Sequence, residues 1–222
     1  MSAALGVLLL RAHAAQGASR NLLVFLHMAV KQRAFQSELQ AALPGTAVTA
    51  VGRVADFDRA LAQGPDAVLT LPVVLAAHGL TPKLRGLRKG AGDEKYTLVA
   101  ADTAPDPRRV AVVGALDLLG REGTTAFVHG LLGAKPKVER VTKFEDLLPL
   151  LQMQRVEALL LPARLLPDIR AASRMNLAPH ELATPVGLPA VASLTAAGGD
   201  IATAVGRLPP ALAAALGVDA WR

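Results

Sequence analysis

Short apolar runs alternate with helical patterns over the first third of the chain. Strand-length apolar runs occupy residues 21–28, 46–51 and 67–71. Each is followed by a segment whose apolar residues recur at a helical spacing, which predicts helices at residues 29–43, 54–63 and 72–78. This βαβαβα order predicts a parallel sheet covered by helices.

The next segment departs from this alternation. Residues 81–87 and 96–101 have extended character, and a charged, Gly-containing turn at residues 88–93 joins them. The pattern predicts a hairpin appended to the first parallel sheet. Pro105 and Pro107 then interrupt the chain, so we place a boundary between two lobes there.

A second series of strands and helices follows this boundary. Its strands are predicted at residues 109–113, 137–142 and 156–161, and its helices at residues 124–132, 144–154 and 164–173. Prolines and a glycine interrupt residues 181–191, which predicts an extended return crossing. A terminal helix is expected over residues 201–216, with a break at the two prolines 209 and 210.

These elements predict an α/β fold of two small lobes, each a mostly parallel sheet with flanking helices, joined by crossing strands. Lobe 1 would comprise residues 20–103 and about 190–222, and lobe 2 residues 104–189. The lobes would close about the crossing segments near residues 100–107 and 181–189. Ligands of open α/β sheets bind where the carboxyl ends of strands converge, so a cleft between the lobes is expected to hold the site.

Composition excludes several protein classes. Apolar residues make up 52% of the 222 residues and charged residues 19%, which excludes a wholly disordered chain. The apolar run at residues 3–10 is far shorter than the ~20 residues that span a bilayer. The chain contains no cysteine, so disulfides, thiol catalysis and cysteine-ligated zinc are excluded.

The N-terminus indicates export. Residues 3–10 resemble the apolar region of a secretory signal peptide, and Ala12-His13-Ala14 has the small-x-small pattern of a cleavage site. We therefore predict a signal peptide at residues 1–14 and a periplasmic location. No Lys or Arg precedes Arg11, and the alternative is that the segment is the first helix of the domain.

The charge balance points to an anionic partner. Lys and Arg number 24 against 18 Asp and Glu, a net charge of +6, which concentrates anions near the surface. Sequence-tolerant nucleic-acid binding also uses aromatic stacking platforms. The chain has seven aromatic residues, mostly within apolar segments, so nucleic acid is disfavoured. A small anion and an acidic surface are the other partners that this charge fits, and the alternative is a solvated basic surface with no partner.

Motifs of catalysis are missing from the sequence. No G-x-G-x-x-G follows a strand, and no G-x-S-x-G is present. The five histidines are dispersed with no i, i+4 pair for a metal. We therefore expect a binding protein rather than an enzyme, with no cofactor and no metal.

Four loops are expected to reach the cleft, because each follows a predicted strand or opens a predicted helix. They contain eight candidate ligand contacts: His27, Met28, Thr70, Pro72, Gly123, Thr124, Thr125 and Arg164. Hydroxyls and backbone amides at a helix N-terminus suit an anion, and Arg164 would pair with one. The alternatives are that Thr124 caps its own helix and that Arg164 points to solvent.

Several of these segments resemble those of the type II periplasmic substrate-binding proteins of ABC importers. The chain is most similar to the phosphate-, phosphite- and phosphonate-binding branch. The resemblance is carried by residues 66–72 (DAVLTLP), 94–99 (EKYTLV), 123–125 (GTT) and 212–221 (LAAALGVDAW). The branch usually has an acidic residue after the strand that here ends at Leu161, where this chain has Pro162 and Ala163.

The resemblance implies an exported, monomeric solute-binding protein that captures a small anion between two lobes and delivers it to an ABC permease. A different class keeps the fold but fills the cleft with aliphatic side chains, which would make the protein a structural or sensory interaction module. A third class, a cytosolic enzyme or regulator domain of similar fold, requires that residues 1–14 be retained.

Overall fold

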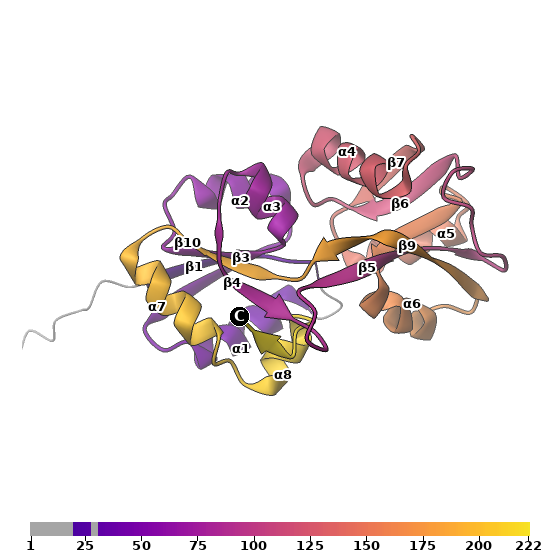
Figure 1. Ribbon diagram of the computed structural model, residues 1–222. Helices are drawn as coiled ribbons and strands as arrows, with labels where there is room; N and C mark the ends of the chain where they lie inside the picture. Colours follow the sequence, from indigo (N-terminus) through magenta and orange to yellow (C-terminus); the bar gives the residue numbers. More distant parts are fainter. Residues whose placement is uncertain (1–19, 28–30) are drawn as a thin grey trace, which may run out of the picture.

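Two sheets, each in its own lobe, organise the chain (Figure 1). The structure is a computed structural model that describes residues 20–27 and 31–222. The predicted signal peptide and Met28 lie outside these residues. The α/β class and the two-lobed arrangement are as the sequence predicts. Among the described residues, no helix is both long and apolar enough to cross a bilayer.

The first lobe contains a six-stranded sheet in the order β11-β4-β10-β3-β1-β2. β1 pairs in parallel with β2 and β3, and β10 runs antiparallel between β3 and β4. The elements up to the first crossing are β1 Arg20–Phe25, α1 Gln32–Ala42, β2 Thr46–Val51, α2 Val54–Leu61, β3 Ala67–Thr70, α3 Pro72–Ala77 and β4 Pro82–Leu87. The chain returns to this lobe with β10 Ala190–Ser193, α7 Ala196–Val205, α8 Pro210–Ala215 and β11 Ala220–Trp221.

The second lobe contains a five-stranded sheet in the order β7-β6-β8-β5-β9. β6 is parallel to β7 and β8, whereas β5 is antiparallel to both of its neighbours. Its strands are β5 Asp93–Ala101, β6 Val112–Leu116, β7 Lys137–Val141, β8 Ala158–Pro162 and β9 Leu177–Gly187. Its helices are α4 Gly120–Leu132, η1 Phe144–Asp146, α5 Leu147–Gln152, η2 Ala163–Leu165 and α6 Leu166–Ala172.

The strand β5 differs from its expected place. The sequence suggested a hairpin attached to the first sheet, but β4 and β5 belong to different sheets, and an isolated bridge between Arg88 and Ala91 closes the turn. Five consecutive residues from Tyr96 to Ala100 are buried. Their side chains enter the cores on both faces of the second sheet, where β5 pairs with β8 on one side and β9 on the other.

The crossings between lobes therefore differ from the predicted boundary near Pro105. One runs through the turn between β4 and β5, and the other through the two residues between β9 and β10. The predicted extended return crossing is confirmed as the long strand β9, which pairs with β5 along most of its length. In Figure 1 these long strands extend from the second lobe toward the first.

Apolar side chains form one core in the first lobe and one on each face of the second sheet. Helices α2 and α3 cover one face of the first sheet, and α1, α7 and α8 the other (Figure 1). Thr195 caps α7 by accepting a hydrogen bond from the amide of Gly198 at 3.2 Å, so this helix begins earlier than expected. The break before α8 falls at Pro209 and Pro210 as predicted.

Candidate ligand site between the lobes

The carboxyl ends of parallel strands from both sheets meet between the lobes. His27 follows β1, Thr70 ends β3, Asp117 follows β6 and Pro162 ends β8. In open α/β sheets the loops after these ends provide the ligand contacts. Several of the ligand contacts predicted from the sequence therefore lie in this region. The neighbours of each side chain show which of them could contact a ligand.

His27 is partly buried at this meeting point, and both of its ring nitrogens are shielded from solvent. Its ring packs edge-on against Phe25, with 5.2 Å between the ring centres. Neither ring nitrogen has a hydrogen-bond partner among the described residues. Burial lowers the pKa of His27 to about 4, and the carboxylate of Asp117 in the second lobe opposes this shift. The imidazole is therefore neutral at pH 7.

Thr70 and Pro72 have structural contacts. The Thr70 hydroxyl is fully buried and donates a hydrogen bond to the carbonyl of Phe25 at 2.6 Å, which joins the ends of β1 and β3. Pro72 is the first residue of α3, where its missing amide proton costs no helical hydrogen bond. Its ring lies against Gly187 at the end of β9. The Thr70 hydroxyl therefore already donates its proton to a backbone carbonyl and has no second proton to donate to a ligand.

The predicted threonine pair lies inside α4 rather than at its tip, because the helix begins at Gly120. The buried Thr124 hydroxyl accepts hydrogen bonds from the amides of Leu118 at 3.1 Å and Leu119 at 2.9 Å. It donates to Asp117 Oδ1 at 2.9 Å. Asp117 also forms an ion pair with Arg140. Thr124 therefore holds the loop that precedes its helix.

The other two residues of this segment also face their own helix. The partly exposed Thr125 donates from its hydroxyl to the carbonyl of Arg121 at 2.7 Å. Gly123 packs against Leu119, and a Cβ atom at residue 123 would be 2.6 Å from the Cβ of Leu119.

Apolar side chains of the second lobe fill part of the space between the strand ends. Leu118, from the loop after β6, is buried in the core of the first lobe, and Leu119 and Phe127 pack against that core. Phe127 also contacts Tyr96 edge-on within the second lobe, with 5.7 Å between ring centres. The lobes are therefore closed on one another at this point.

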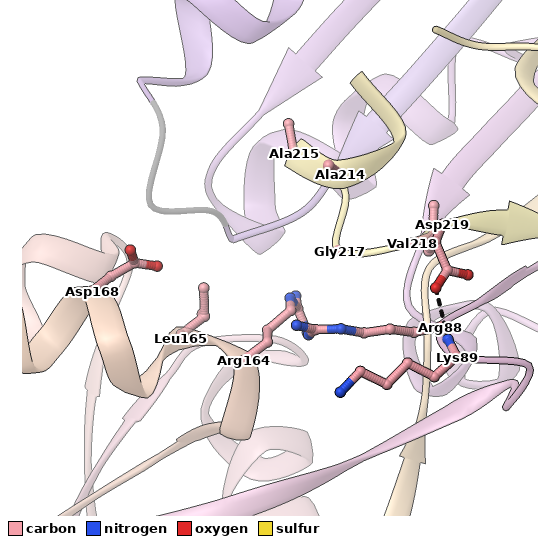
Figure 2. Close-up of a pocket in the computed structure, with 10 residues that line it drawn as sticks. All are labelled: Arg88, Lys89, Arg164, Leu165, Asp168, Ala214, Ala215, Gly217, Val218 and Asp219. Carbon is pink, nitrogen blue, oxygen red and sulfur yellow. Dashed lines mark hydrogen bonds between the residues drawn. The ribbon is translucent and has the colours of Figure 1, made fainter. Parts of the chain in front are cut away.

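A cavity of about 400 Å³ lies between the lobes at the turn that joins β4 to β5 (Figure 2). Both lobes line it, with η2 and α6 on one side and the end of α8 with the segment that follows it on the other. Its lining residues are Arg88, Lys89, Arg164, Leu165, Asp168, Ala214, Ala215, Gly217, Val218 and Asp219. Among the lining residues, Arg164 is one of the ligand contacts that the sequence predicts.

The guanidinium of Arg164 is held tightly in this cavity. It forms an ion pair with Glu94 of β5, and the two side chains are 11% and 7% exposed. It also lies against Gly217 of the first lobe, where a Cβ atom would be 2.5 Å from Nε. Burial, and then repulsion from Arg88, lowers the pKa of Arg164 to about 10, so it is still charged at pH 7.

A second cavity, of about 270 Å³, lies at the carboxyl ends of β2 and β7. It too is lined from both lobes, by Gln32, Ala50, Val51, Gly52, Arg53, Asp56, Thr142 and Lys143. Within the described ranges, no cluster of three or more metal-binding side chains is placed to hold a metal ion.

Five residues of the inter-lobe region were not among the ligand contacts predicted from the sequence: Arg88, Lys89, Glu94, Asp117 and Gly217. The turn that contains Arg88 and Lys89 is visible in the sequence, but its neighbour Gly217 lies at the other end of the chain. Asp117 follows a predicted strand end by only a few residues, and that position is the signal that could have found it.

Comparison with protein-family models and with curated proteins gives no match. Solved structures do match. XAC2383 from Xanthomonas citri, bound to ATP, is similar over 92% of this chain and 91% of its own, with 13% identity and a TM-score of 0.61. The periplasmic VFT2 domain of BvgS from Bordetella pertussis is similar over 89% and 92%, with 13% identity and a TM-score of 0.57.

The ancestral amino acid-binding protein AncCDT-1, a precursor of cyclohexadienyl dehydratase, is similar over 85% of this chain and 86% of its own. Its identity is 13% and its TM-score 0.57. The chain has the fold of the type II periplasmic binding proteins. At 13% identity these similarities show the fold alone. The kind of ligand depends on the side chains between the lobes.

Proposed function

We propose that this protein is a non-catalytic solute-binding protein that captures a small anionic ligand, phosphate- or phosphonate-like, between its two lobes. The observation that carries this proposal is the 400 Å³ cavity, because both lobes line it and three of its residues are cationic. A ligand that contacts both lobes favours their closed arrangement, since those contacts are complete only when the lobes are closed.

The neighbouring folds support the general class. XAC2383 is described as bound to ATP, an anion, and AncCDT-1 as an amino acid-binding protein. Export to the periplasm and delivery to an ABC permease by a monomeric protein belong to the same proposal. They are supported by the secretory pattern at the N-terminus and by the periplasmic VFT2 neighbour.

A thermal-unfolding series with phosphate, methylphosphonate, sulfate, carboxylate and amino-acid solutes tests the proposal. A ligand at 100 times its Kd stabilises the folded state by about 2.7 kcal/mol, which raises the Tm by roughly 5–10 °C for a protein of this size. A rise with phosphate or methylphosphonate supports the capture of a phosphate-like anion. A rise with amino acids alone would keep solute binding and exclude the phosphate-like ligand.

A second function, that of an interaction or sensory module, is favoured by a different observation. Leu118, Leu119 and Phe127 fill part of the inter-lobe space, and the hydroxyls of Thr70 and Thr124 are used within the fold. If no solute shifts the Tm and the protein instead co-purifies with a membrane partner, this second function replaces the first. Co-purification from the native host would show whether that membrane partner is a permease.

A further inference from the structure

We propose that the anionic group of the ligand is bound by Arg88 and Lys89, at the turn between β4 and β5, and that Arg164, which is paired with Glu94, does not contact it. This inference rests on the proposed function and deepens it. The ligand group is a compact oxyanion, a carboxylate or a phosphate-type group on a small solute.

Arg164 is already committed to a partner. Its ion pair with Glu94 is buried from solvent on both sides, and Gly217 confines the guanidinium from the first lobe. Removing one member of a buried ion pair leaves the other charge uncompensated, which is strongly unfavourable. A ligand that drew Arg164 away from Glu94 would incur that cost. Arg164 is therefore suited to shape the cavity rather than to bind the anion.

Arg88 and Lys89 are in the opposite situation. Neither side-chain cation has a hydrogen-bond or ion-pair partner within the part of the chain that the structure describes. In Figure 2 the Arg88 side chain extends toward the guanidinium of Arg164, and Lys89 extends along the cavity below it. The guanidinium groups of Arg88 and Arg164 repel each other, and an oxyanion bound to Arg88 relieves that repulsion.

The backbone of the turn that presents these two side chains is held by hydrogen bonds without a ligand. Arg88 and Ala91 exchange two backbone hydrogen bonds of 2.8 and 3.0 Å. Lys89 has a left-handed backbone with φ of 51°, and its amide donates to Asp219 Oδ2 at 2.7 Å. The turn is thus fixed to the C-terminal segment before a ligand arrives, which lowers the entropy lost on binding.

The two carboxylates of the lining define where the anion lies. Asp219 faces the backbone of Lys89, and Asp168 stands on the far side of Leu165, at the exposed start of α6 (Figure 2). The positive potential is therefore concentrated at the side chains of Arg88 and Lys89, because Glu94 compensates the charge of Arg164. Replacing Asp168 by Asn removes a negative charge from the lining and is expected to tighten anion binding.

Isothermal titration calorimetry at low ionic strength with inorganic phosphate, methylphosphonate and succinate tests the inference. The double variant Arg88→Gln/Lys89→Gln is expected to bind at least about 10-fold more weakly, because two charge-assisted contacts are lost. Its matched control is Lys83→Gln/Arg85→Gln, which removes the same two charge types from exposed positions of β4 outside the cavity lining. The control is expected to stay within about threefold of wild type.

The role of Arg164 is tested by Glu94→Met/Arg164→Met, which replaces the buried ion pair by apolar side chains together. We expect affinity within about threefold of wild type. If this variant does not fold, Arg164→Lys, which keeps a cation beside Glu94, is expected to bind as wild type does. A Kd unchanged in Arg88→Gln/Lys89→Gln, or a loss of 10-fold or more in either Arg164 variant, would overturn the inference.

The two proposals fail in different ways. If wild-type protein binds none of the three anions, the proposed anionic ligand is wrong, and the inference falls with it. If wild type binds one of them but the Arg88 and Lys89 variant binds it equally well, solute binding stands and only this inference is wrong.

Discussion

Gly187 lies directly against Pro72, and a Cβ atom at residue 187 would be 2.7 Å from Cγ of the proline ring. Gly187 ends β9, the long strand of the second lobe, and Pro72 begins α3 of the first. The absence of a side chain at residue 187 therefore lets the second crossing pass close to the first lobe. The closed contact between the lobes depends on this approach.

Replacing Gly187 by Ala is expected to lower the free energy of unfolding by about 1–3 kcal/mol, because the new methyl group overlaps Pro72. Chemical denaturation measures the change. Gly130→Ala is the matched control, since residue 130 lies in α4 with open space around it. That control is expected to stabilise the protein by roughly 0.5–1 kcal/mol through helix propensity. Equal effects of the two variants would contradict the contact.

The Leu118 side chain belongs to the second lobe by sequence and to the core of the first lobe by packing. Truncating it by Leu118→Ala is expected to cost about 2–4 kcal/mol and to favour an open arrangement of the lobes. Small-angle scattering should show a larger radius of gyration. Leu132→Ala is the control, because Leu132 is equally buried, at 5% exposure, but within the second lobe alone. That variant should lose stability without opening.

The hydroxyl of Thr124 serves two backbone amides and one carboxylate. Thr124→Val keeps the shape but leaves buried polar groups unpaired, at an expected cost of about 2–3 kcal/mol. Thr125→Val is expected to stay within about 0.5 kcal/mol, since the hydroxyl of this partly exposed residue bonds a helical carbonyl. Comparable losses in urea unfolding of both variants would show that Thr124 does not hold the loop.

His27 should make stability depend on pH. Burial lowers its pKa to about 4 in the folded state, against about 6.5 in an unfolded chain. The unfolded state therefore binds more protons between these values, and the contribution of His27 is complete above pH 6.5 and lost as the pH falls toward 4. At pH 5 the expected loss is about 2 kcal/mol relative to pH 7.

The measurement is denaturant unfolding at pH 7 and pH 5 for wild type and for His27→Gln. Because glutamine does not titrate, the difference between the two pH values should shrink by about that amount in the variant. Parallel behaviour of the two proteins would mean that other groups cause the pH dependence.

The sequence determined the elements of the chain where local pattern decides them. Residues 46–51 were predicted as a strand with the bounds that the structure has, because this short run is rich in β-branched threonine and valine. The helices before Pro44 and Gly64 and the break at Pro209 and Pro210 likewise follow from residues that restrict the backbone locally. The α/β class follows from the order of these elements.

Tertiary structure alone decided to which sheet β5 belongs and which polar side chains have no partner within the protein. β5 pairs with β8 and β9, some 60 to 90 residues later in the chain, so no local pattern could assign it to the second sheet. The hydroxyl of Thr70 looked free until β1 placed the carbonyl of Phe25 beside it. The sequence likewise suggested that Arg164 could pair with a ligand, whereas in the structure it pairs with Glu94 and packs against Gly217. Hydrogen bonds and ion pairs between distant residues set the chemistry of this site, because only the folded chain brings their partners within reach.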